Sequence, residues 1–482
     1  MRRQRIATLT FCFLLALGAT SASWAQNLPQ FCSYGYFRAN VSFVDNYAFG
    51  EGDGDEQQIT QRLRQYFEYT ANENLSAQVA YEIDSGWGWE GESGFGNDEA
   101  GQIEIKRAQL DFNWPNTDVS FNVGLTGWVA PGGPFGTPVL AGDMPGAFVN
   151  VPVNDMMGLT AGYIRASDQK RIYDDDKADG DELDAALLSL PLTMEGYNMN
   201  PYLIYSWIGE NSEPNSYMDI NDFQSWGMGV GTLATQLGKD DPASPWNMHS
   251  DEANAWWVGL PFGVDMFDPL SIKGQVLYGR VDADHEAMER EGYYMDLGID
   301  YAMDMVTPSV FGIYSSGEDD DISDGSETFP TLYSDGYLYP PSGVAMGFNS
   351  HFGFRDGDYS LAQYIPHGIW TLGFALKDIS FVDKLSHTVA CAYSQGTHDS
   401  EVFEKMSDAE LDVFKGQRFQ ELTDEDSSLE VTLHSNYQIY ENLKAVLELS
   451  YASLDMDEDV WRSDDYRDED AIVSTFGLSY SF

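Results

Sequence analysis

The stretch Leu75-Ser76-Ala77-Gln78-Val79-Ala80-Tyr81-Glu82-Ile83-Asp84 places apolar side chains at its odd positions and small or polar ones at its even positions. Successive side chains of a β-strand point to opposite faces of the sheet, so this spacing predicts a strand with one apolar and one polar face. A tilted strand needs about ten residues to cross a membrane. The stretch therefore predicts a membrane-spanning strand with lipid on one face and water on the other.

The same alternation recurs along the chain, as at 119–126, 429–434 and 443–451. The connections alternate between tight turns and long polar stretches, whereas the turns of a soluble β-sandwich would recur about every 8–12 residues. Short periplasmic turns with long external loops are typical of a transmembrane antiparallel β-barrel. We therefore expect an all-β chain that forms such a barrel, with long extracellular loops.

Counting segments by this rule predicts about 18 strands, an even number that returns both termini to the periplasm. The segment at 147–153 is short and contains Pro152. Without it and one neighbour, the alternative count is about 16 strands. The expected strands are 33–46, 58–70, 75–84, 104–114, 118–127, 147–153, 156–167, 183–192, 199–210, 253–264, 271–283, 291–302, 305–316, 367–380, 385–397, 427–439, 442–455 and 470–482.

The composition excludes other classes of protein. After the first residues no run of 18 apolar residues occurs, so a helical membrane protein is excluded. Aromatic residues make up 14% of the chain and charged residues 21%, as expected for a barrel whose alternation cancels its mean hydropathy. The net charge of −53 would repel nucleic acid, and most of it falls in the predicted loops.

The first residues indicate export. Three arginines precede an apolar run at 6–18, and the small residues Ser23 and Ala25 stand at −3 and −1 of a cleavage site. A membrane anchor would need about 20 apolar residues, and this run is shorter. We expect a cleaved Sec-type signal peptide at 1–25 and a single outer-membrane barrel domain at 26–482, with no lipid anchor.

The last strand carries a more specific signal. Aromatic and aliphatic side chains alternate up to the final residue. This pattern resembles the C-terminal signature that the barrel-assembly machinery reads in outer-membrane proteins, so that machinery is an expected partner. The residues of this expected assembly signal are Phe476, Leu478, Tyr480 and Phe482.

The polar faces of the predicted strands contain both basic and acidic groups. A wide barrel needs a polar interior in any case. As a set, however, opposed basic and acidic side chains would define a transverse field in a pore. The expected pore-lining residues are Arg38, Arg62, Arg64, Glu82, Asp84, Arg107, Asp111, Asp296 and Asp300.

The segment 128–146 differs from the acidic loops because it is apolar and rich in Pro and Gly. Exposed, it would favour aggregation; folded into the barrel, it would be packed and would narrow the channel. We expect it to fold inward as a constriction loop, with an external flap as the alternative. Asp143 is then the acidic group expected to face the arginines.

Cofactor and disulfide chemistry has little support. Cys32 lies on a polar strand face and Cys391 on an apolar one, and residues on opposite faces of a barrel wall cannot form a disulfide. The segment 175–180 resembles a calcium loop, but Lys177 takes a ligand position and Ala186 stands where the bidentate Glu should be. We expect no cofactor and no dedicated metal site; loose binding of divalent cations by the acidic loops is possible.

Competing function classes lack their sequence features. The seven histidines are scattered and no nucleophile motif surrounds them, so we expect no enzyme. The strand pattern begins too close to the expected mature N-terminus for the plug domain of an energised receptor. A structural or adhesive role of the acidic surface loops would be compatible with a pore.

One resemblance combines these signals. The export signal, the opening Tyr34-Gly35-Tyr36-Phe37-Arg38, the strand Arg107-Ala108-Gln109-Leu110-Asp111-Phe112 and the terminal Phe482 together resemble the major homotrimeric porins of sulfate-reducing bacteria. The resemblance implies a homotrimer that admits small hydrophilic solutes and ions by passive diffusion. Outer-membrane lipid and lipopolysaccharide would surround it. A substrate-selective channel is the alternative.

Overall fold

The computed structural model describes residues 29–46, 56–87, 103–168, 182–209, 232–238, 252–334, 368–415, 422–462 and 469–482. The expected signal peptide and the segment 175–180 lie outside these residues. Among the described residues, no helix is long and apolar enough to cross a membrane.

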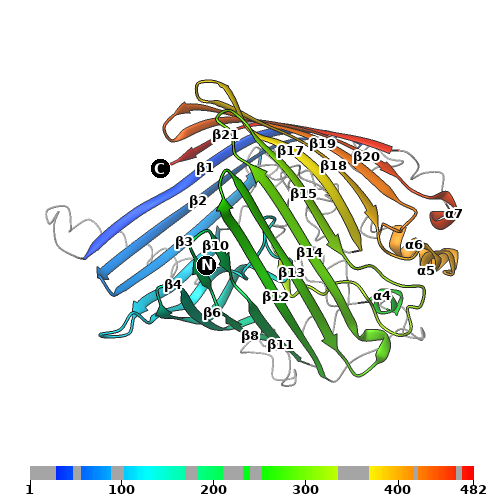
Figure 1. Ribbon diagram of the computed structural model, residues 1–482, viewed down its shortest axis with the longest axis horizontal. Coiled ribbons are helices and arrows are strands. Elements are labelled where there is room, and N and C mark those ends of the chain that lie inside the picture. The colour runs from blue at the N-terminus through cyan, green and yellow to red at the C-terminus, as the bar shows by residue number, and fades with distance from the viewer. Residues whose placement is uncertain are drawn as a thin grey trace, which may run out of the picture.

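The chain forms a closed antiparallel β-barrel of 18 strands, as predicted (Figure 1). Two barrel strands are interrupted, and the short strand β16 (Tyr333–Ser334) lies in a loop. The barrel strands are β1 (Gln30–Asp45), β2 (Glu56–Asn72), β3 (Leu75–Gly86), β4 (Ile103–Asn113), β5 (Ser120–Val129), β6 (Leu140–Asn154), β7 (Met157–Asp168), β8 (Glu182–Ser189) continued by β9 (Leu192–Met194), β10 (Tyr197–Met199) continued by β11 (Tyr202–Gly209), β12 (Glu252–Phe267), β13 (Leu270–Asp282), β14 (Arg290–Tyr301), β15 (Thr307–Ser315), β17 (Ile369–Val382), β18 (Leu385–Gly396), β19 (Ser427–Tyr440), β20 (Leu443–Asp455) and β21 (Glu469–Ser481).

The barrel closes where β1 pairs with β21, so the first and the last strand lie side by side (Figure 1). At the end of this seam, the Gly35 N–H donates to the Phe482 carbonyl oxygen at 2.9 Å, and the Phe482 N–H donates to the Gly35 carbonyl oxygen at 3.0 Å. A Cβ on residue 35 would overlap with the Arg64 carbonyl oxygen, so the seam needs a glycine there. The last residue of the chain thus takes part in barrel closure.

The outer face of the barrel is apolar. Its exposed large side chains include Val79, Leu203, Val258, Leu372 and Phe476. A closed barrel pairs its backbone groups within the wall, and an apolar outer face of this kind is stable only in lipid. Cys32 and Cys391 are both free, as predicted.

The segment expected to fold inward does so, as a β-hairpin rather than as a loop. β5 pairs with β4 only up to Leu125, and β6 pairs with β7 only from Gly146 onward. Beyond these points β5 and β6 stay paired with each other and leave the wall together. Gly124, with φ of +128°, lies where the hairpin departs. We call residues 126–145 the infolded hairpin.

The infolded hairpin packs on the far inner wall. The Phe135 and Phe311 rings meet edge to face with centroids 5.6 Å apart. The Gln275 side-chain amide donates to the Gly136 carbonyl oxygen at 2.8 Å. Pro and Gly look loop-like in the sequence, yet Gly146 serves close packing: a Cβ there would lie 2.8 Å from the Tyr163 carbonyl oxygen.

A second segment, 316–334, also folds inward, although the sequence predicted an external loop at 317–366. The Trp257 indole N–H donates to the Pro330 carbonyl oxygen at 2.8 Å, and Arg290 Nε donates to the Thr328 carbonyl oxygen at 3.0 Å. β16 then pairs with Leu140 and Ala141 of the infolded hairpin. Residues 335–366 of the expected loop lie outside the described residues.

These two segments cover half of the inner wall. Most of the inward side chains of β7 to β15 are therefore apolar and buried, which the strict alternation did not predict. They include Ile204, Trp257, Leu277, Tyr294 and Phe311. The other half of the inner face, from β17 through β21 to β4, keeps polar side chains such as Thr371, Glu430, Thr475 and Asn40.

Short helices gather at the end of the barrel where the long loops lie (Figure 1). Phe403 and Trp461 pack with ring centroids 5.1 Å apart. Asp426 joins two loops, because it accepts hydrogen bonds from Trp461 Nε1 at 2.9 Å and from the Asp457 N–H at 2.7 Å. Burial raises the pKa of the Asp426 carboxyl. The helices are α4 (Leu233–Gly238), η1 (Glu286–Met288), α5 (Ser400–Glu404), α6 (Asp408–Lys415) and α7 (Glu458–Trp461).

Deletion of Phe482 should impair barrel assembly, because the seam loses both hydrogen bonds to Gly35. The folded barrel is expected to migrate differently from the unfolded chain in unheated detergent gels, and the deletion should reduce the folded band. Phe482→Tyr keeps the backbone and the aromatic ring and serves as the control. Normal yield of the folded form from the truncated chain would contradict the role of this residue.

Candidate functional site

Charged side chains line the inner wall from β1 to β4 and reach the infolded hairpin. We call this set the charged wall. It consists of Arg38, Arg62, Arg64, Glu82, Asp84, Glu104, Lys106, Arg107 and Asp143.

The pairs on β2 and β3 follow from strand register. Arg62 stands opposite Asp84 and Arg64 opposite Glu82, so each pair shares one face. Arg62 Nε lies 2.6 Å from Asp84 Oδ1, and Arg64 Nε lies 2.5 Å from Glu82 Oε2. Glu82 is almost fully buried and also lies 3.5 Å from Arg62 Nε and from Lys106 Nζ. Glu82 is therefore the centre of the charged wall.

A β-bulge adds a residue that the sequence analysis missed. On β3, Ala80 pairs with Arg107 and Tyr81 pairs with Ile105, so Lys106 is the extra residue. Lys106 Nζ lies 2.7 Å from Glu104 and 3.5 Å from Asp143. A signal was present in the sequence, because the apolar spacing of two residues lengthens to three between Ile105 and Ala108.

We expected acidic groups to face the arginines across the lumen, and only Asp143 does so from a separate segment. Asp143 lies on the infolded hairpin, and its carboxylate forms an ion pair with Arg107 of the wall. Glu82 and Asp84, by contrast, lie on the same wall as the arginines. Register places them beside Arg64 and Arg62 instead of across the lumen.

Arg38 completes the wall on β1, where it pairs in register with Arg62. Its guanidinium carbon lies 5.9 Å from the centroid of the Tyr36 ring. Arg64 lies at the same distance from that ring. Tyr36 thus separates two cations and offers each the electron-rich face of its ring.

Of the two expected lining residues of β14, Asp296 is buried and Asp300 is partly exposed. Asp296 is 4% exposed, and the infolded hairpin covers it. It accepts hydrogen bonds from Gln275 at 2.5 Å and from the Tyr294 hydroxyl at 3.2 Å. Asp300 lies nearer the short turns and pairs with Lys377 at 2.6 Å.

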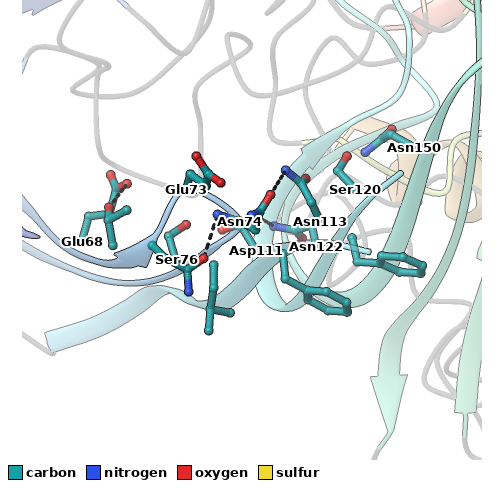
Figure 2. Close-up of a pocket in the computed structure, with 14 residues that line it drawn as sticks. Glu68, Glu73, Asn74, Ser76, Asp111, Asn113, Ser120, Asn122 and Asn150 are labelled. Atoms are coloured by element: carbon teal, nitrogen blue, oxygen red, sulfur yellow. Dashed lines mark hydrogen bonds between the residues drawn. The ribbon is translucent and has the colours of Figure 1, made fainter. Parts of the chain in front are cut away.

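Asp111 lines a separate pocket at the short-turn end of β2 to β6, which has a volume of about 250 Å³ (Figure 2). Asn122 and Gln109 donate side-chain hydrogen bonds to its two carboxylate oxygens at 2.6 and 2.9 Å. The described residues that line this pocket include no Lys or Arg. Its polar lining consists of Glu68, Thr70, Asn72, Glu73, Asn74, Ser76, Asp111, Asn113, Ser120, Asn122 and Asn150.

A second group of carboxylates lies in the segment 316–334. Oxygens of Asp319, Asp324 and Glu327 all lie within 4.8 Å of one another. Carboxylate oxygens are ligands that calcium and magnesium prefer.

The four residues of the expected assembly signal lie on the outer face of β21, where their side chains are exposed toward lipid. The Tyr480 and Phe482 rings stack with centroids 5.6 Å apart. They therefore belong to the outer surface and not to the lumen.

The sequence matches no known family and no curated protein. Among solved structures, the chain is similar to OccK11 (OpdR) of Pseudomonas aeruginosa, with a TM-score of 0.50, 10% identity, and coverage of 94% of this chain and 96% of the other. It is also similar to OpdL of Pseudomonas aeruginosa, with a TM-score of 0.50, 11% identity, and coverage of 94% and 99%. At these identities the likeness shows the fold alone. With its closed barrel and apolar outer face, the protein is a multi-pass β-barrel of the outer membrane.

Replacing Glu82 by Gln should destabilise the barrel, because three cations around a buried position lose their shared carboxylate. We expect a loss of about 3 kcal/mol, seen as a lower temperature at which the folded gel band disappears. Glu104→Gln is the matched control, since Glu104 is half exposed and, among the described residues, forms its ion pair with Lys106 alone. The control should change stability by at most about 1 kcal/mol. Equal stability of the two variants would contradict the central role of Glu82.

Proposed function

We propose that the protein is an outer-membrane channel through which small hydrophilic solutes and ions diffuse passively. The observation that carries the proposal is the asymmetric lumen: one half of the inner wall is packed by two infolded segments, whereas the other half keeps the charged wall. A polar interior with charged side chains is typical of water-filled barrels.

The proposed path follows the charged wall. Ions and solutes would enter at the end of the long loops and pass between the charged wall and the infolded hairpin. They would leave beside the pocket that holds Glu68, Glu73 and Asp111. Charges in such a narrow passage act on solutes at short range, so they are screened by salt less than the charges of the outer loops.

A substrate-selective channel is the second candidate. The observation in its favour is that the infolded hairpin and the segment 316–334 together leave less than the whole lumen for transport. In a selective channel, the flux of one class of solute would saturate as its concentration rises. The same solute would block the ion conductance. A general porin would show conductance proportional to the salt concentration.

We propose no catalytic activity. His387 Nδ1 lies 2.8 Å from Ser435 Oγ, a base beside a hydroxyl that the sequence analysis did not foresee. In the part of the chain that the structure describes, no carboxylate is hydrogen-bonded to this ring, so nothing orients it as a general base.

Binding of divalent cations by Asp319, Asp324 and Glu327 remains a proposal, as does a structural or adhesive role of the acidic loops. We also propose that the protein contacts the barrel-assembly machinery and lipopolysaccharide.

Reversal potentials in planar bilayers under a salt gradient test the channel and its selectivity. We expect weak cation preference at low salt that decreases as salt rises, because the loop charges are screened over about 8 Å at physiological ionic strength. The double variant Arg62→Ala, Arg64→Ala should strengthen the cation preference, since Asp84 and Glu82 lose their arginine partners. Lys405→Ala, which removes an exposed loop cation paired with Asp320, is the control. Strong anion selectivity of the unmodified protein would contradict the proposal.

We further propose that the channel is a homotrimer, as the resemblance implies and the broad apolar outer face allows. Cross-linking in native membranes should then capture dimers and trimers, and detergent extracts should hold a trimer that dissociates on heating. Capture of monomers alone, at cross-linker doses that join a known trimeric porin in the same membranes, would refute it.

A further inference from the structure

Gly127 occupies an unusual place on the infolded hairpin. It lies on β5 directly opposite Asp143 of β6. A Cβ on residue 127 would overlap with Nη2 and Cζ of Arg107 and would lie 2.9 Å from Nη1. The Arg107 guanidinium therefore fills the space that any side chain at position 127 would need.

The glycine is required for this space and not for its backbone conformation. Gly127 is absent from the residues with positive φ among those the structure describes, in contrast to Gly124. An alanine could adopt the same backbone without strain. The constraint at position 127 is thus the guanidinium alone.

The contact between Arg107 and Gly127 lies where the wall meets the infolded hairpin. Arg107 extends from β4 of the wall, where pairing with β5 has already ended, to Asp143 of the hairpin. The ion pair joins β4 of the wall to β6 of the infolded hairpin. Neighbouring Lys106 approaches the same carboxylate at 3.5 Å. Asp143 thus neutralises Arg107 where the two walls of the path meet.

We propose that Gly127 is a selectivity-determining position: its missing side chain lets Arg107 lie flat on the hairpin, paired with Asp143 and out of the path of ions. A side chain at 127 turns the guanidinium away from Asp143 and into the lumen as a cation without its carboxylate. The pore then becomes narrower and its cation preference falls. This inference rests on the proposed channel function.

The test is Gly127→Ala, measured by reversal potential and single-channel conductance in planar bilayers. We expect cation permeability to fall by about two- to five-fold, the effect of one unit charge at roughly 4 to 8 Å in water, and the cation-to-anion permeability ratio to fall with it. Conductance should fall as well. Gly312→Ala is the matched control, because a Cβ there has only the Thr371 carbonyl oxygen near it, at 3.4 Å. It should leave both quantities unchanged.

A second pair of variants shows whether the effect passes through Arg107. Gly127→Ala added to Arg107→Ala should change neither the permeability ratio nor the conductance relative to Arg107→Ala alone. If Gly127→Ala does not fold, recovery of the folded gel band in the double variant supports the clash with Arg107. Failure of that double variant to fold would overturn the inference.

The outcomes also separate this inference from the proposed function. An unmodified protein that does not conduct would refute the channel itself. An unmodified protein that conducts, with Gly127→Ala indistinguishable from it in permeability ratio, would overturn the role of Gly127 and leave the channel intact.

Discussion

The structure depends on one constraint: within lipid, every backbone N–H and C=O must find its partner inside the protein. A closed antiparallel barrel meets this constraint, and it closes only when β1 pairs with β21. Closure explains the alternation of side chains, since each strand then has lipid on one side and the lumen on the other. It also explains why the last residue matters, because Phe482 hydrogen-bonds to Gly35 at the seam.

The lumen of a barrel of this width must be filled by protein segments or by water. The infolded hairpin and the segment 316–334 fill one half, and they bury aromatic side chains such as Trp257 and Phe311. The inner face from β17 through β21 to β4 instead keeps polar side chains such as Thr371 and Thr475. The proposed path runs along the charged wall, across the lumen from these packed segments.

Along the proposed path, the charged wall has nearly balanced positive and negative charges, whereas the pocket near the short turns has only acidic groups among its described lining residues. The charged wall holds five cations, Arg38, Arg62, Arg64, Lys106 and Arg107, against four carboxylates, Glu82, Asp84, Glu104 and Asp143. The pocket near the short turns holds Glu68, Glu73 and Asp111, with no Lys or Arg among its lining residues. A solute would thus pass from a nearly neutral, highly polar region to an acidic one.

The sequence by itself determined the barrel, its 18 strands, the inward course of the segment 128–146 and the free cysteines, because period-two alternation and turn spacing are local properties. It also placed Arg62, Arg64, Glu82 and Asp84 on the inner face of the wall, where the structure has them. Only the tertiary structure decided which charges meet. Register places Glu82 beside Arg64, a bulge adds Lys106, and the hairpin brings Asp143 to Arg107. Alternation assigns a residue to a face of the sheet but does not say which residue lies next to it. The ion pairs, the inward fold of the segment 316–334 and the contact of Arg107 with Gly127 therefore follow from contacts between segments that are distant in the sequence.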